Sequence, residues 1–141
     1  MTPATQKTLA DLIKDARITL KAERTDTNPN MEPVSRGSMD HWKVKLTRPV
    51  PKPIHRFTMT TYFSMGFGHN GAEPDVAGVL DCLLSDSDAL DRDFEDWASE
   101  LGFDADSRRA EKTYKACLKS GEKLKTFLGD ELFERMRYAE R

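Results

Sequence analysis

The alternation of apolar and polar residues predicts two neighbouring strands near the middle of the chain. From Trp42 to Leu46, apolar residues alternate with lysines, which is typical of a strand with one buried and one basic face. A second alternation covers about 56–64. Three prolines lie between the two runs and end the first strand, because proline cannot donate to a sheet ladder. We therefore expect an antiparallel hairpin over about 41–64, which needs helices packed on its apolar face.

Apolar residues at helical spacing predict a helix before this hairpin and three to four helices after it. The predicted helices are one over about 3–22, one opened by Pro74, one carrying Phe94 to Leu101, one from about Ser107 and a short one after Gly129. The predicted fold class is therefore α+β, with the antiparallel hairpin packed against these helices and a further helix at the N-terminus.

The stretch 25–39 is rich in Pro, Asn, Ser and Gly and has no hydrophobic period, which is typical of a linker. We therefore expect an N-terminal helix within 1–24, a linker over 25–39 and a single α+β domain over 40–141. The total of 141 residues fits one such domain. The first helix is either packed on this domain or appended to it as an arm.

Composition favours a soluble protein of the cytoplasm. Charged residues make up 33% of the chain, and no apolar run approaches the roughly 18 residues of a membrane-spanning helix. The N-terminal segment is interrupted by charges, which excludes a signal peptide there. Cys82 and Cys117 are far apart and lie on the apolar faces of predicted helices, where a reduced thiol behaves as a small apolar group.

Charge is distributed unevenly along the chain although the net charge is only −2. Residues 81–104 carry nine acidic residues against one basic residue, Arg92. Neither Asp86 nor Asp91 begins a loop with the calcium-binding EF-hand pattern. The block is therefore either a solvated surface or part of a protein interface. In the second case the predicted partner-binding acids are Asp86, Asp88, Asp91 and Asp93.

Basic residues gather on the first predicted strand and on the long predicted helix. These candidates for contacts with a phosphate backbone are Lys43, Lys45, Arg48, Arg108, Lys112, Lys115 and Lys119. The four on the helix follow one another by three or four residues and so share one face. Basic stripes are also the usual solvated side of an amphipathic helix, so both interpretations stay open.

A glycine-rich segment, Gly66-x-Gly68-x-x-Gly71, follows the second predicted strand and precedes a predicted helix. That context matches a dinucleotide-binding turn, but no parallel strand with an acidic residue follows, so a sharp turn is the simpler interpretation. We expect no cofactor. Met65, Phe67 and His69 lie in this segment and are either core residues or exposed anchors for a partner.

No catalytic signature is present in the sequence. The three histidines are not spaced as metal ligands. Neither Ser64 nor Cys82 has the local sequence of a nucleophile. We therefore expect a protein that binds rather than one that catalyses, with no metal and no membrane partner.

Four segments carry a family resemblance: WKVKL (42–46), YFSMGFGHNG (62–71), EPDVAGVLDCLLSD (73–86) and FEDWASELGFDADSRRAEKTYKAC (94–117). Over about its last hundred residues the chain resembles a small family of accessory proteins common in bacteriophages and prophages. The resemblance implies a short phage gene acting in the host cytoplasm, and it carries over no functional residue. Short phage proteins with polarised charge include many inhibitors of bacterial defence, anti-CRISPR proteins among them.

The leading hypothesis is thus a non-enzymatic anti-defence inhibitor that binds a host nucleoprotein complex, such as a CRISPR effector, through its acidic surface. The alternative is a DNA- or RNA-binding accessory protein that uses the basic strand and helix faces. Self-association into a homo-oligomer is compatible with both.

Overall fold

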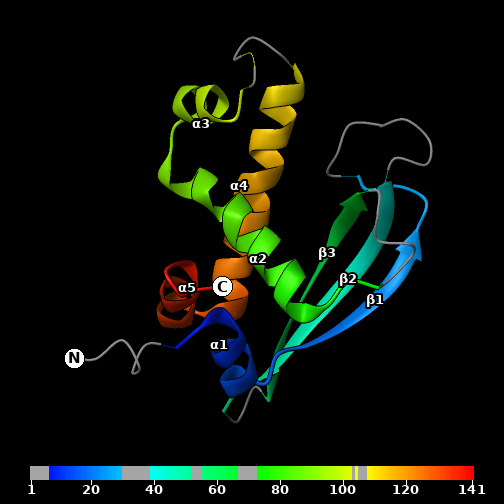
Figure 1. Ribbon diagram of the computed structural model, residues 1–141, viewed down its shortest axis with the longest axis vertical. Helices are drawn as coiled ribbons and strands as arrows, with labels where there is room; N and C mark the ends of the chain where they lie inside the picture. The colour runs from blue at the N-terminus through cyan, green and yellow to red at the C-terminus, as the bar shows by residue number, and fades with distance from the viewer. Residues whose placement is uncertain (1–6, 30–38, 52–54, 67–72, 103, 105–107) are drawn as a thin grey trace.

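A three-stranded antiparallel sheet, in the order β1-β2-β3, carries the helices on one face (Figure 1). The computed structural model describes residues 7–29, 39–51, 55–66, 73–102, 104 and 108–141. Its elements are α1 (Leu9–Ala16), β1 (Thr19–Thr25), β2 (Met39–Pro49), β3 (Arg56–Gly66), α2 (Val76–Asp86), the 3₁₀ helix η2 (Ser87–Asp91), α3 (Phe94–Glu100), α4 (Arg108–Leu128) and α5 (Asp130–Arg137). The predicted α+β class is confirmed.

The predicted hairpin is formed by β2 and β3. Their antiparallel register places Trp42 opposite Phe63 and Leu46 opposite Met59. Val44 and Leu46 are fully buried, whereas the lysines between these apolar residues are exposed. The alternation in the sequence therefore identified both the strand and its buried face.

The helix predicted over 3–22 is wrong in its second half. Among the described residues, α1 ends at Ala16, and Arg17 follows it in the left-handed conformation with φ 57°. The Ile18 amide then donates to the Ile13 carbonyl at 3.2 Å, which closes the helix end. Thr19–Thr25 is strand β1 and pairs with β2 along its whole length. The sheet therefore has a third strand that the hairpin prediction lacked.

The first helix belongs to the core and is not an appended arm. Its residues Leu9 and Leu12 are each 3% exposed within the main hydrophobic cluster. The Leu9 amide also donates to the carbonyl of Glu140 at 2.8 Å, which ties the start of α1 to the C-terminal segment. The predicted linker begins at the last residue of β1 and ends at the first of β2, while 30–38 lie outside the described residues.

The helices after the hairpin occur where they were expected. The first begins after Asp75, whose side chain accepts from the Gly78 amide at 2.7 Å and caps the helix, so Pro74 precedes the cap. In α3, Trp97 is buried against Tyr114 of α4, with ring centroids 5.2 Å apart. Leu101, expected on the same buried stripe, is 59% exposed because α3 ends before it.

Candidate functional site

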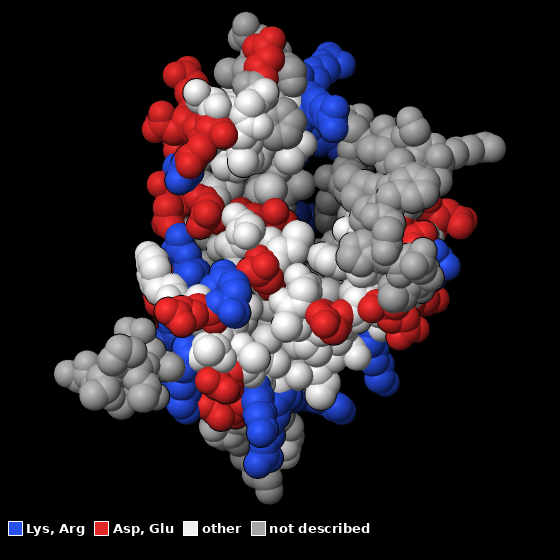
Figure 2. Space-filling view, viewed as in Figure 1, with Lys and Arg blue, Asp and Glu red and all other residues white. Residues whose placement is uncertain are grey.

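The acidic block spans the end of α2, η2 and α3, and Figure 2 shows its carboxylates gathered along the side of the molecule that α3 and η2 form. Its carboxylates differ in their surroundings: some hold other parts of the protein, and others have no hydrogen-bond or ion-pair partner among the described residues. The four predicted partner-binding acids fall into three structural settings, which decide what each can do.

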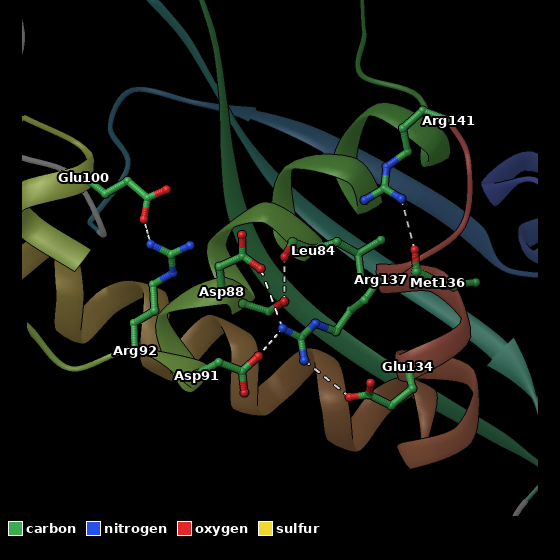
Figure 3. Close-up of polar contacts among 10 residues, drawn as sticks. Leu84, Asp88, Asp91, Arg92, Glu100, Glu134, Met136, Arg137 and Arg141 are labelled. Carbon is green, nitrogen blue, oxygen red and sulfur yellow. Dashed lines mark hydrogen bonds and ion pairs between the residues drawn. The ribbon is translucent and has the colours of Figure 1, made fainter. Parts of the chain in front are cut away.

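Asp88 and Asp91 of η2 hold the guanidinium of Arg137, at the end of α5 (Figure 3). The Arg137 side chain is only 12% exposed and also bonds Glu134, with Nη1 to Oε1 at 3.3 Å. The guanidinium carbon of Arg137 lies over the ring of Phe133, 5.3 Å from the ring centroid. These two acids therefore fasten α5 to η2, and a shielded cation offsets part of their charge.

Asp93 is the N-cap of α3, where its carboxylate accepts from the amide of Asp96 at 2.9 Å. Glu95 and the carboxylate of Asp96 occupy the exposed first turn of this helix. Neither has a hydrogen-bond or ion-pair partner among the described residues. They are the part of the block whose charge is available to a partner, and the charge distribution along the sequence did not separate them from Asp88 and Asp91.

Asp86 is separated from these exposed acids because it lines a cavity of about 280 Å³ between β3, α2 and α4. The cavity wall also includes the side chains of Cys82, Thr113, Cys117 and Ser120. These neighbours are uncharged at neutral pH, and no ion pair to Asp86 occurs within the part of the chain that the structure describes. Asp86 is thus a carboxyl group in a largely apolar pocket and not part of an open acidic surface.

Burial raises the pKa of Asp86 to about 6, although the hydrogen bond from the Cys117 thiol lowers it in part. Burial also raises the pKa of the Cys117 thiol, to about 12, and the nearby charge of Asp86 is the second largest cause. Cys117 is therefore a protonated donor at neutral pH and a poor nucleophile. Cys82, expected to be buried, is exposed at the cavity wall.

The glycine-rich segment is only partly described. Met65 is half-buried in β3 and packs against the main core, which supports the core interpretation for this residue. Phe67 and His69 lie outside the described residues, as do Gly68 and Gly71.

The predicted basic residues occupy two different faces. Lys43 and Lys45 are exposed on the sheet face opposite the helices, since the residues between them are in the core. Arg48 has an internal role: its Nε donates to the Phe127 carbonyl at 2.6 Å. The candidates on α4 are all exposed: Arg108, Lys112, Lys115 and Lys119. Lys115 forms an ion pair with Glu111 at 2.8 Å.

A polar group at one end of β3 has no signal in the sequence pattern. Ser64 Oγ accepts from the Asn28 amide at 2.9 Å and lies 2.7 Å from Nδ1 of His41. Asn28 is 8% exposed and, like Ser64, lines the cavity that contains Asp86. The register of β2 and β3 aligns His41 with Ser64, whereas Asn28 follows β1. The three residues are 13 to 36 positions apart in the sequence, so no local pattern indicates that they meet.

No family model, curated protein or solved structure matches this chain. Within the described ranges, no helix combines the length and apolar character needed to cross a membrane. The same ranges contain no group of three or more His, Cys, Asp or Glu side chains placed to hold a metal ion. The candidate sites are therefore the acidic surface of η2 and α3, the Asp86 cavity and the basic sheet face.

Proposed function

We propose that this protein is a non-enzymatic binding protein, a phage-encoded inhibitor that engages a basic surface of a host defence nucleoprotein, with a CRISPR effector as the leading candidate. The exposed charge of η2 and α3 carries the proposal. From Asp88 to Glu100 this surface presents six exposed carboxylates. Among the described residues, only the guanidinium groups of Arg92 and Arg137 pair with them.

An acidic surface of this kind complements the lysine- and arginine-rich grooves that bind nucleic acid, and it increases the rate of encounter with them. Leu101, 59% exposed at the end of α3, adds an apolar contact beside the charge. The resemblance to phage accessory proteins supports the biological setting. Glu95 and Asp96 are the acids expected to contact the partner, because no contact within the described residues uses their charge.

The test is a pair of neutralising variants with a matched control. Glu95→Gln/Asp96→Asn removes two first-turn carboxylates of α3, and Asp130→Asn/Glu131→Gln removes two from the first turn of α5. Tagged protein is first used to capture its partner from nuclease-treated host lysate, and affinity for the purified partner is then measured. We expect the α3 variant to bind at least about tenfold more weakly and the α5 variant to bind normally.

Equal affinity of the two variants would contradict the acidic-surface proposal. Variants of Asp88, Asp91 or Asp93 are unsuitable for this test, because their carboxylates hold α5 or cap α3. Loss of binding in those variants would report on folding as much as on contact.

A second candidate function is nucleic-acid binding by the open face of the sheet. The register of β1 and β2 places Lys21 directly opposite Lys45, and Lys43 lies on the same face, opposite Glu23. Like charges directly opposite one another cost stability, which favours a bound anion as their reason for being there. We expect Lys43→Gln/Lys45→Gln to make the slope of log affinity against log salt concentration shallower, by the amount that corresponds to about two phosphate contacts. Lys115→Gln/Lys119→Gln should leave this slope unchanged. A wild-type protein that binds no oligonucleotide would exclude this function.

A further inference from the structure

The outer edge of β3 is open among the described residues, because β3 is the last strand of the sheet and pairs only with β2. Lys123 of α4 reaches across this edge and donates to the carbonyl of Thr60 at 3.4 Å. The backbone groups of Thr60 therefore point away from β2. Since successive residues of a strand direct these groups to opposite sides, those of Thr58, Tyr62 and Ser64 point the same way.

A groove follows this edge between β3 and α4. One cavity of about 510 Å³ lies between Phe57–Thr60 and the last turns of α4, from Glu122 to Phe127. The cavity that contains Asp86 continues along the next four residues of β3, up to Ser64, and the preceding turns of α4. Together the two cavities cover eight consecutive residues of the strand. Small side chains, mainly Thr, Ser and Ala, form much of the wall.

Asp86 gives one end of the groove a chemical preference. Its carboxyl lies in a cavity whose other described lining residues carry no cation. A carboxylate that is half-buried and has no cation beside it is unfavourable, and an ammonium or guanidinium group brought into the cavity would offset that cost. The hydroxyl groups of Thr113 and Ser120 and the amide of Asn28 are further polar groups of the same wall.

We propose that this groove binds an extended polypeptide segment, which adds to β3 as a fourth strand and places a Lys or Arg side chain beside Asp86. Backbone donors and acceptors that alternate along an open strand edge match another peptide backbone, whereas a nucleic-acid strand offers no such repeat. In the free protein Lys123 donates a hydrogen bond to the Thr60 carbonyl, and its side chain moves aside when the segment binds. This surface is separate from the acidic surface of η2 and α3.

A folded second copy fits this groove less well than a single segment does. The groove is walled by α4 of the same chain, so a second sheet that paired through its own β3 would bring a second α4 against the first. An extended segment carries no such layer. Self-association through β3 is accordingly an outcome that the experiment must detect.

The test begins with selection of binders from a random decapeptide library on the full-length protein. We expect the recovered peptides to share one Lys or Arg at a common position. We also expect β-branched or aromatic residues at every second position. Each is then measured against wild type, Asp86→Asn and Glu95→Gln/Asp96→Asn. Asp86→Asn should weaken binding about tenfold or more, whereas the double variant of the acidic surface should bind normally. Peptides without a common cation, or equal binding to Asp86→Asn, would overturn the proposal.

Strand addition is tested first with wild-type protein and modified peptides, so that this result does not depend on the folding of a variant. Two forms of the best peptide carry N-methyl groups at alternate positions, one form methylated at odd and the other at even residues. Binding should be lost for one form and kept for the other, because only one set of amides faces β3. Equal effects of both would exclude strand addition. Lys123→Ala should strengthen binding. A dimer of the free protein that the peptide dissociates would show that a second copy occupies the same groove, and it would overturn the assignment to a separate segment.

Discussion

Arg48 of β2 donates from Nε to the carbonyl oxygen of Phe127 in the last turn of α4, at 2.6 Å. The guanidinium carbon also lies 5.0 Å from the centroid of the Phe57 ring. A cation on the terminal carbonyls of a helix is favourable, and this one joins the sheet to its main covering helix. We expect Arg48→Met to lower the free energy of unfolding by about 2 kcal/mol, measured by urea denaturation.

Lys43→Met is the matched control, because Lys43 lies on the same strand with its side chain exposed on the other face of the sheet. Its effect on stability should stay within about 0.5 kcal/mol. If both variants lost the same stability, the bond from Arg48 to α4 would contribute nothing. Because Arg48 holds α4 against the sheet, a loss of oligonucleotide binding in Arg48→Met could come from a weakened fold and would not identify Arg48 as a phosphate contact.

Gly121 allows α4 to pack closely against η2. A Cβ atom at this position would lie 3.0 Å from Cδ1 of Leu90 and 3.1 Å from the Cα of Ser87. Helix propensity alone predicts that Gly121→Ala gains about 1 kcal/mol, but the backbone of Ser87 cannot move aside cheaply. We expect a net loss of about 1–2 kcal/mol in urea denaturation. The exposed control Lys119→Ala should be nearly neutral, and a stabilised Gly121→Ala would contradict the close packing.

Sequence patterns predicted most of this fold because most elements have a single clear period, and α1, α2 and α3 also begin with a side-chain cap. The exception is the segment after α1. Leu20 continues the helical spacing of Leu9 and Leu12, yet it also belongs to the alternation of Ile18, Leu20 and Ala22. Pairing with β2 and the left-handed turn at Arg17 decide for the strand. A local pattern that fits two periods cannot be resolved without the partner strand.

The candidate sites were less predictable than the fold. Counting charges located the acidic block, but it could not show that Asp88 and Asp91 meet Arg137, 46 or more residues away. It also grouped Asp86 with them, although Asp86 faces a cavity. The open edge of β3 has no signal in composition, because an edge strand differs from a central one only in its neighbours.

Arg137 is expected to be the main attachment of α5 to η2. Its guanidinium is largely shielded and contacts Asp88 and Asp91 from η2 (Figure 3). We expect Arg137→Met to lower the free energy of unfolding by about 2 kcal/mol. In a double-mutant cycle, Arg137 and Asp91 should couple by about 1 kcal/mol, whereas Arg137 and Glu95 should not couple measurably. Coupling of equal size in both cycles would show a general charge effect and not a direct contact.

Asp86 should make stability fall as pH rises. Because the pKa of its carboxyl is about 6 in the folded protein and 3.8 ordinarily, the folded state holds this proton more tightly than the unfolded state between those values. The contribution of Asp86 to the free energy of unfolding is therefore greatest below pH 4 and declines until about pH 6, by at most about 3 kcal/mol. Asp86→Asn removes this decline, and its side chain makes no cap hydrogen bond that would be lost.

We expect Asp86→Asn to be more stable than wild type at pH 7 by about 1–3 kcal/mol and equal to it near pH 4, in urea denaturation over that range. Glu95→Gln, which replaces an exposed acid without a partner among the described residues, should show no such gain at pH 7. A variant less stable than wild type at pH 7 would mean that the cavity stabilises the carboxylate. A gain would mean that Asp86 lowers the stability of the free protein, and an acid that does so is better explained by a ligand than by the fold.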